Sequence, residues 1–213
     1  VNRTNIAKLD YATGNAFTNW GHSASHTVHA LATDSEGRVY LGGDFGSVWN
    51  LPFTRLARIN ADGFLDFSWR PGTDGGGVRA LMVQGTQVYV GGSFRLINSV
   101  SRSGIGRVSI VDGALSTWNP VGADFPPGIG FPTVRALARA QDGGIIAGGN
   151  FRFLGGAYRS NVVKLDPQTG MADPLWNPST SAPVNAVLAG YGSTPVSIRR
   201  PDVEQNIAIG GEF

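Results

Sequence analysis

Residues 134–151 read VRALARAQDGGIIAGGNF, and this stretch contains the pattern that decides the fold. An apolar run that begins at Val134 is followed by the turn pair Asp142-Gly143 and by a second apolar run, which ends in Gly-Gly-x-Phe at Phe151. Short apolar runs on either side of an Asp-Gly turn are typical of a β-hairpin. The stretch therefore predicts two antiparallel strands.

The same pattern occurs four times along the chain. A Val-x-Ala sequence followed by an apolar residue opens each copy, and a Gly-Gly-x-Phe tetrad closes it. The copies begin at Val28, Val78, Val134 and Val184 and end at Phe45, Phe94, Phe151 and Phe213. The last copy has a long insertion before its tetrad, residues 190–206. Self-similarity at a period of roughly fifty residues is typical of repeat architectures.

A second half-repeat precedes the first copy and follows each of the first three tetrads. It places a basic residue between apolar ones, then a glycine turn, then a tryptophan. The basic residues are Lys8, Arg58, Arg107 and Lys164, and the tryptophans are Trp20, Trp69, Trp118 and Trp176. Each repeat thus supplies about four short strands, and no window has helical apolar spacing. We predict an all-β fold, a β-propeller of four-stranded antiparallel blades with about four repeat equivalents.

The repeats divide the chain without leaving room for a second fold. We predict one β-propeller domain over residues 1–213, with a half-repeat 1–27, the repeats 28–76, 77–132 and 133–183, and a half-repeat 184–213. Two arrangements are compatible with the two halves. They combine into one blade that closes a four-bladed ring, or the chain is a segment of a larger propeller. The absence of an initiator methionine favours a piece of a longer chain or assembly.

The repeat resembles that of the delta-sixty family of bacterial β-propellers. In that family a Val-x-Ala strand leads through an Asp-Gly-type turn to Gly-Gly-x-Phe and then to an aromatic-x-Pro ending. Residues 133–178 match nearly end to end, finishing at Trp176-Asn177-Pro178. One departure is Phe53, which occupies the position of an arginine in the other copies, Arg3, Arg102 and Arg159. The resemblance implies a module of a large secreted or surface protein of bacteria.

Composition and charge limit the classes of partner that we expect this chain to bind. The formal net charge of +2 is small for 213 residues and favours no nucleic-acid partner. No run of eighteen apolar residues is present, so we expect no membrane insertion. The chain has no cysteine and lacks nucleotide-loop, nucleophile-elbow and zinc-site motifs. We therefore expect no enzyme activity, no cofactor and no metal. The family resemblance implies an extracellular or cell-surface location.

Two polar columns are candidate ligand sites. By analogy with other propellers the Val-x-Ala strand is innermost, so its variable residue lines the channel mouth. That column is His29, Arg79, Arg135 and Asn185. Its arginines suit a carboxylate or phosphate ligand, whereas the alternative is that these side chains are solvated or pair with acids of neighbouring blades. The variable residue of Gly-Gly-x-Phe, namely Asp44, Ser93, Asn150 or Glu212, binds a cation such as calcium or caps a turn.

Two loops are candidate partner-binding sites. Trp49 belongs to no repeated column, and with Leu51 and Phe53 it forms an apolar loop that either contacts a partner or tucks inward. The insertion at 190–206 carries Arg199 and Arg200. The histidines at positions 22, 26 and 29 cluster, but their loop spacing does not favour zinc.

These features favour a non-enzymatic, rigid scaffold that binds other protein chains or a surface glycan through its loops. Two alternatives stay open. One is a propeller-type hydrolase or lyase with its site at the channel mouth. The other is a structural spacer in a large adhesin or filament.

Overall fold

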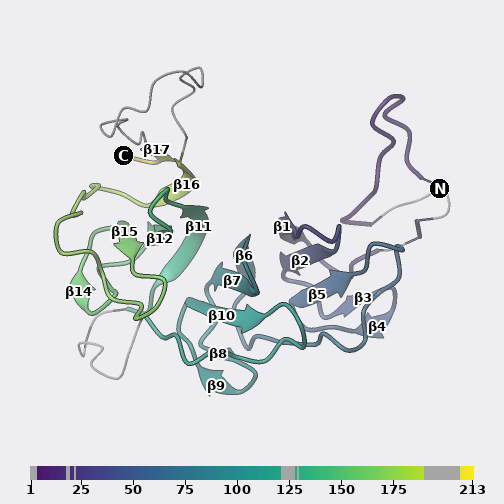
Figure 1. The fold of residues 1–213 in the computed structure, drawn as a ribbon, viewed down its shortest axis with the longest axis horizontal. Helices are drawn as coiled ribbons and strands as arrows, with labels where there is room; N and C mark the ends of the chain where they lie inside the picture. The colour runs from purple at the N-terminus through teal and green to yellow at the C-terminus, as the bar shows by residue number, and fades with distance from the viewer. Residues whose placement is uncertain (1–3, 18–19, 22, 121–127, 129, 190–206) are drawn as a thin grey trace. The chain divides into compact units, whose positions relative to one another are not determined.

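The computed structural model describes residues 4–17, 20–21, 23–120, 128, 130–189 and 207–213, and all regular structure within them is β-strand (Figure 1). The predicted all-β fold is confirmed. Contacts divide the chain into two compact units, Val1–Thr117 and Trp118–Phe213. We call them unit 1 and unit 2.

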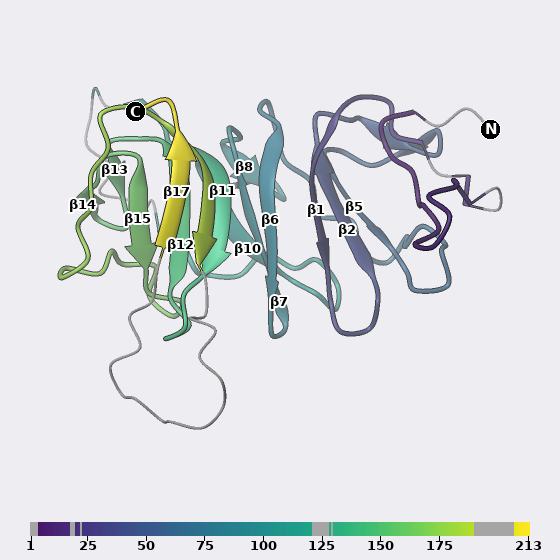
Figure 2. The same ribbon diagram turned by 90° about the horizontal axis from the view of Figure 1, so that it is seen from above.

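Each unit is built from small antiparallel sheets in series. Unit 1 has one sheet of β1 (Val28–Thr33), β2 (Val39–Gly43) and β5 (Leu56–Ile59), and a second of β6 (Val78–Gln84), β7 (Gln87–Gly92) and β10 (Ile105–Ser109). Unit 2 has one of β11 (Thr133–Arg139), β12 (Ile145–Asn150) and β15 (Val162–Leu165), and a pair, β16 (Val184–Ala189) and β17 (Ile207–Gly211). Figure 2 shows β16 and β17 beside β11 and β12.

The fourth strand of each predicted blade is reduced to a short segment. Isolated bridges join it to the third strand, at Ile59 and Leu65, at Val108 and Leu115, and at Leu165 and Ala172. In the first of these repeats the Asp66 N–H also donates to the Arg58 carbonyl, 2.9 Å away. The antiparallel order of four segments is therefore kept, with the last too short to count as a regular strand.

Each repeat also carries a two-residue hairpin between its second and third strands, which the sequence patterns did not predict. The hairpins are β3 (Ser47–Val48) with β4 (Leu51–Pro52), β8 (Leu96–Ile97) with β9 (Val100–Ser101), and β13 (Phe153–Leu154) with β14 (Ala157–Tyr158). Their two-residue turns have positive φ at both positions, as a type I′ turn requires.

The Gly-Gly pairs are required where two chain segments pass close together. A Cβ at Gly42 would lie 2.4 Å from a γ-methyl of Val78, on the first strand of the next sheet. A Cβ at Gly43 would lie 2.1 Å from the carbonyl oxygen of Thr27. In unit 2, Gly148 and Gly149 meet Val184 and Thr133 in the same two ways. The tetrad thus sets both the packing between sheets and the pairing within one.

The repeated tryptophans link successive repeats. The indole N–H of Trp69 donates to the carbonyl of Ser109, at 2.8 Å, and that of Trp118 donates to the carbonyl of Asp166, at 3.1 Å. Both rings are buried. The boundary between the two units falls at Trp118, whose indole is bonded to the repeat that follows it.

The repeated basic residues occupy the sheet face opposite their apolar neighbours, as alternation predicts. Arg58 is buried and its Nε donates to Asp66 at 2.9 Å, while its guanidinium lies 5.9 Å from the ring centre of Tyr40 and 5.6 Å from that of Trp69. In unit 2 the equivalent Lys164 pairs with Asp142 and Asp173. An acid therefore accompanies the basic residue in both of these repeats.

Candidate functional site

A β-bulge places each residue of the first polar column. In β1, Val28 pairs with Gly43 and Ala30 pairs with Gly42, so the residue between them, His29, has no counterpart in the ladder. The same irregularity occurs in β6, β11 and β16, at Arg79, Arg135 and Asn185. A bulge turns its extra residue away from the regular alternation. Here it turns the side chain toward the end of the strand where the Gly-Gly-x-Phe tetrad lies.

In unit 1 the bulge brings the two polar columns together. Nε2 of His29 lies 2.7 Å from an Asp44 carboxylate oxygen and 2.8 Å from a guanidinium nitrogen of Arg79. The Arg79 guanidinium is itself 3.9 Å from that carboxylate. All three side chains are partly exposed. One imidazole nitrogen cannot donate to Asp44 and accept from Arg79 at once, so the tautomer of the His29 ring decides which of these two hydrogen bonds Nε2 makes.

Unit 2 repeats the arrangement with an amide in place of the imidazole. A guanidinium nitrogen of Arg135 donates to Oδ1 of Asn185 at 2.6 Å, and Nδ2 of Asn185 donates to Glu212 at 3.4 Å. Arg135 lies 3.9 Å from the Glu212 carboxylate. In both units, therefore, an arginine of one repeat faces an acid from the tetrad of an adjacent repeat.

These contacts bear on both ligand hypotheses from the sequence. Arg79 and Arg135 each share their positive charge with a carboxylate, as the ion-pair alternative expects, which weakens the attraction for a free anion. Both tetrad acids contact bulge residues: the Asp44 carboxylate lies within hydrogen-bond distance of His29, and Glu212 accepts a hydrogen bond from Asn185. Whether the column also faces a channel stays a prediction.

The hydrogen bond from His29 lowers the pKa of the Asp44 carboxyl below its usual range; burial opposes this and Arg79 adds to it. Because the folded pKa is depressed, the stabilising contribution of Asp44 exists above the ordinary pKa and is lost as the pH falls through the lowered one. We expect carbon-detected NMR titration to give an Asp44 pKa that moves back toward 3.8 in His29→Ala. An unchanged value in the variant would show that His29 does not hold this carboxylate.

The candidate partner loop is a hairpin tip. Trp49 and Asn50 have φ of 55° and 61°, at the turn between β3 and β4. The equivalent turn residues are Asn98 and Ser99 in the next repeat and Gly155 and Gly156 in the one after. The expectation that Trp49 stands outside the repeat columns is therefore wrong, because it takes the first turn position of a repeated hairpin. Its side chain is 45% exposed.

The other two residues of this predicted loop have different environments. Leu51 is half-buried, and Phe53 is 2% exposed and packs in the core of its repeat. Phe53 therefore offers no side chain for direct contact, because the type I′ turn folds β4 back and turns this ring inward. Two exposed side chains cover it: Arg70, whose guanidinium lies 4.7 Å from the ring centre, and Phe67, whose ring centre is 5.8 Å away.

Several predicted residues lie outside the described part of the chain. Arg199 and Arg200 are among them, and so is His22. Among the described residues, no three His, Asp or Glu side chains are grouped as a metal-ligand set. No helix in this part of the chain is long and apolar enough to cross a membrane.

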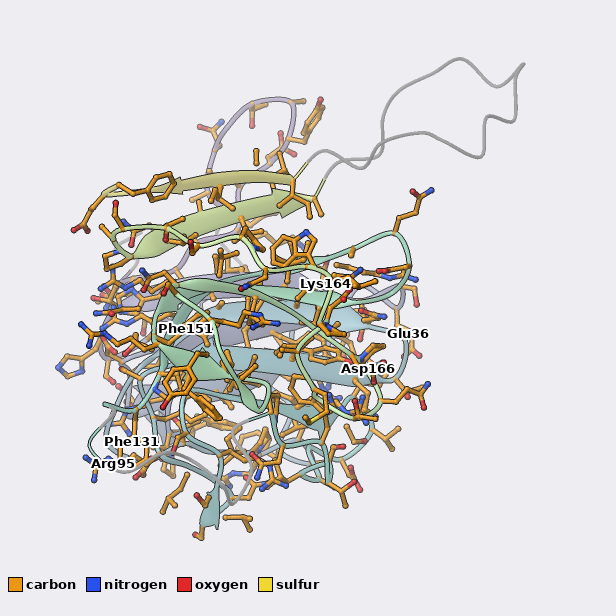
Figure 3. All side chains as sticks on the ribbon, turned by 90° about the vertical axis from the view of Figure 1, so that its left-hand side faces the viewer. Glu36, Arg95, Phe131, Phe151, Lys164 and Asp166 are labelled. Carbon is orange, nitrogen blue, oxygen red and sulfur yellow. The ribbon has the colours of Figure 1, made fainter. Side chains whose placement is uncertain are left out.

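Unit 2 has two surface hollows that are alternative candidate sites. One, of about 290 Å³, is lined by Phe131, Asn150, Phe151 and Arg152. The other, of about 240 Å³, is lined by Lys164 with Asp142, Asp166 and Asp173. Figure 3 shows Phe131 and Phe151 at one end of the strands and Lys164 and Asp166 at the other. The hydrogen bond from Lys164 lowers the pKa of Asp142, so this carboxylate is ionised and bonded at neutral pH.

The serial antiparallel sheets, the close Gly-Gly contacts and the tryptophan links together define a β-propeller repeat protein. The family model described as a β-propeller domain of unknown function (DUF5122) matches residues 35–68 and 140–175. Each match runs from the turn of the first hairpin into the segment before the tryptophan. The matches support assignment to a β-propeller repeat family, as the sequence resemblance predicted. No curated protein matches the chain.

Proposed function

We propose that this β-propeller repeat domain is a non-enzymatic scaffold of a secreted or cell-surface bacterial protein, and that it binds another protein chain or a surface glycan through the Trp49 hairpin. The repeats hold the loops rigidly, and rigid frames commonly carry recognition on loops. The resemblance to propeller modules of large bacterial surface proteins supports the location.

The backbone of Trp49 is the observation that carries the proposal. A bulky residue at positive φ costs about 1 kcal/mol or more relative to glycine, and such strain persists where the side chain is needed. The equivalent turn in the third complete repeat has Gly155 and Gly156, which adopt the same conformation without strain. Trp49 keeps the strain while nearly half of its side chain is exposed, and tryptophan is enriched at binding hot spots.

The alternative of a propeller-type hydrolase or lyase receives less support. A general acid needs a carboxyl group whose pKa is raised toward neutrality. The carboxylates gathered around Lys164 have lowered values, Asp142 because of the lysine and Asp173 chiefly because of the Leu175 N–H. Asp44 at the bulge cluster is lowered as well.

Trp49→Gly tests the proposal. Glycine fits the left-handed turn, so we expect the free energy of unfolding to change by less than about 1 kcal/mol while binding is lost. The wild-type chain and the variant are compared on an immobilised glycan array and on a displayed library of short peptides. Tyr158→Gly, which removes an exposed aromatic ring from the hairpin of another repeat, is the control. Equal capture by wild type and Trp49→Gly would contradict the proposal.

A further inference from the structure

The first complete repeat differs from the other two in how it satisfies one backbone carbonyl. In the second, Arg102 donates to the carbonyls of Ser101 and Ser116, at 2.7 and 2.8 Å. In the third, Arg159 donates to those of Tyr158 and Asp173, at 2.9 and 3.1 Å. Each of these arginines directly follows the second strand of the small hairpin, β9 or β14, and its hydrogen bonds join that strand to the fourth segment of the repeat. Both are partly buried.

The first repeat has Phe53 at this position, so the arginine that bonds to the second hairpin strand, β4, comes from another position in the sequence. Arg70, which follows Trp69, donates to the carbonyl of Pro52, the equivalent of Ser101 and Tyr158. Its guanidinium reaches that carbonyl from above the Phe53 ring and is exposed. With phenylalanine in place of the partly buried arginine, the guanidinium that bonds to this strand is exposed at the surface of the repeat.

This exchange creates a surface specific to the first repeat. All four of its residues are exposed: Trp49, Pro52, Phe67 and Arg70. Arg70 is bonded to the Pro52 carbonyl, and both Arg70 and Phe67 contact the ring of Phe53. Trp49 forms the tip of the hairpin whose second strand carries Pro52. Among the described residues, Arg70 makes no ion pair with a carboxylate. We call these four residues the Trp49–Arg70 surface.

We infer that the Trp49–Arg70 surface binds an acidic peptide segment of another protein, in which an Asp or Glu lies next to an aromatic residue or a proline. This inference rests on the proposed function and names its partner. The guanidinium supplies a charge that a carboxylate complements, and the rings of Trp49 and Phe67 supply apolar contact. Arg70 is the only charged side chain of the surface, and a sugar with many hydroxyls would require more polar groups.

The test selects seven-residue peptides from a displayed library against the wild-type chain. The best binder is synthesised in two forms, as selected and with each Asp or Glu changed to Asn or Gln, and affinities are measured by fluorescence anisotropy. Arg70→Gln is compared with Arg139→Gln, which removes the same charge from an exposed position in unit 2. Thermal unfolding checks that each variant is folded, and Phe67→Ser, at a second exposed position, tests the surface without touching the Pro52 bond.

The inference predicts enrichment of peptides with a carboxylate beside a ring. It further predicts about tenfold weaker binding for Arg70→Gln and for the amide peptide, weaker binding for Phe67→Ser, and no change for Arg139→Gln. Selected peptides without acids, or equal binding by Arg70→Gln, would overturn it. Glycan capture that depends on Trp49, with no peptide bound, would overturn the inference but support the proposed function. Capture of neither class would overturn both.

Discussion

Gly43→Ala is expected to lower the free energy of unfolding by about 3 kcal/mol, measured by urea denaturation. The added Cβ would lie 2.1 Å from the carbonyl oxygen of Thr27 and 3.0 Å from the Cα of Val28. Both are backbone atoms, which cannot rotate away as a side chain does. The first two strands of the repeat would have to separate at the bulge that positions His29.

Gly46→Ala is the matched control for this substitution. A Cβ at Gly46, three residues further along the chain, meets nothing within 4 Å, and its φ is not in the left-handed region. We expect a change within about 0.5 kcal/mol, because alanine also restricts the unfolded chain. If the two variants were equally stable, the close pairing of Gly43 with the first strand would be wrong.

Arg58→Met is expected to destabilise unit 1 by about 3–5 kcal/mol at neutral pH. Methionine keeps an apolar stem beside the packed rings of Tyr40 and Trp69, but it leaves the buried carboxylate of Asp66 without its cation. Removing one partner of a buried ion pair costs more than replacing both. The double variant Arg58→Met, Asp66→Asn should therefore recover at least about 1.5 kcal/mol of the loss.

The pH dependence of the Arg58→Met effect distinguishes a charge effect from lost packing. Burial raises the pKa of Asp66, but hydrogen bonds from Ser68 and Arg58 outweigh it and hold the pKa below 3.8. The stability contributed by this carboxylate is thus present above its ordinary pKa and lost as the pH falls. The difference between wild type and Arg58→Met should shrink below about pH 4. A difference independent of pH would indicate packing alone.

The fold could be predicted from the sequence because the constraints are local and repeated. The Gly-Gly pairs mark close approaches of backbone, and the alternation around Arg58 separates a buried apolar face from a face that carries ion pairs. The tryptophans at a fixed repeat position predicted packing, and two of them bond to the repeat that follows.

The small hairpins and the bulges were not predicted, for different physical reasons. Two-residue strands have too few side chains to show an alternating pattern, although the Gly155-Gly156 pair is a recognisable type I′ signal. The bulge joins two polar columns that are separate in the sequence, the variable residues of Val-x-Ala and those of Gly-Gly-x-Phe. Strand register is set by geometry around the turn and the neighbouring sheet, which no single column reveals.

The partner surface could be predicted only in part. Trp49 could be identified from the sequence as a candidate contact residue. Phe53 could be identified as the exception at a repeat position that is arginine in the other copies. The link between this break and Arg70 could not be predicted, because the two positions are seventeen residues apart in the sequence and meet only through the fold. The buried ring of Phe53 lies beneath the Trp49–Arg70 surface and contacts two of its exposed residues, Phe67 and Arg70.

The most direct test of the central claim is a nitrogen-15 NMR titration of the chain with the selected acidic peptide, observed at the five tryptophan indoles. If the Trp49–Arg70 surface binds the peptide, the Trp49 indole signal shifts with peptide concentration, while those of Trp69 and Trp118 stay fixed because each is bonded to a carbonyl of the next repeat. A Trp49 signal that stays fixed while the peptide binds elsewhere would contradict this claim.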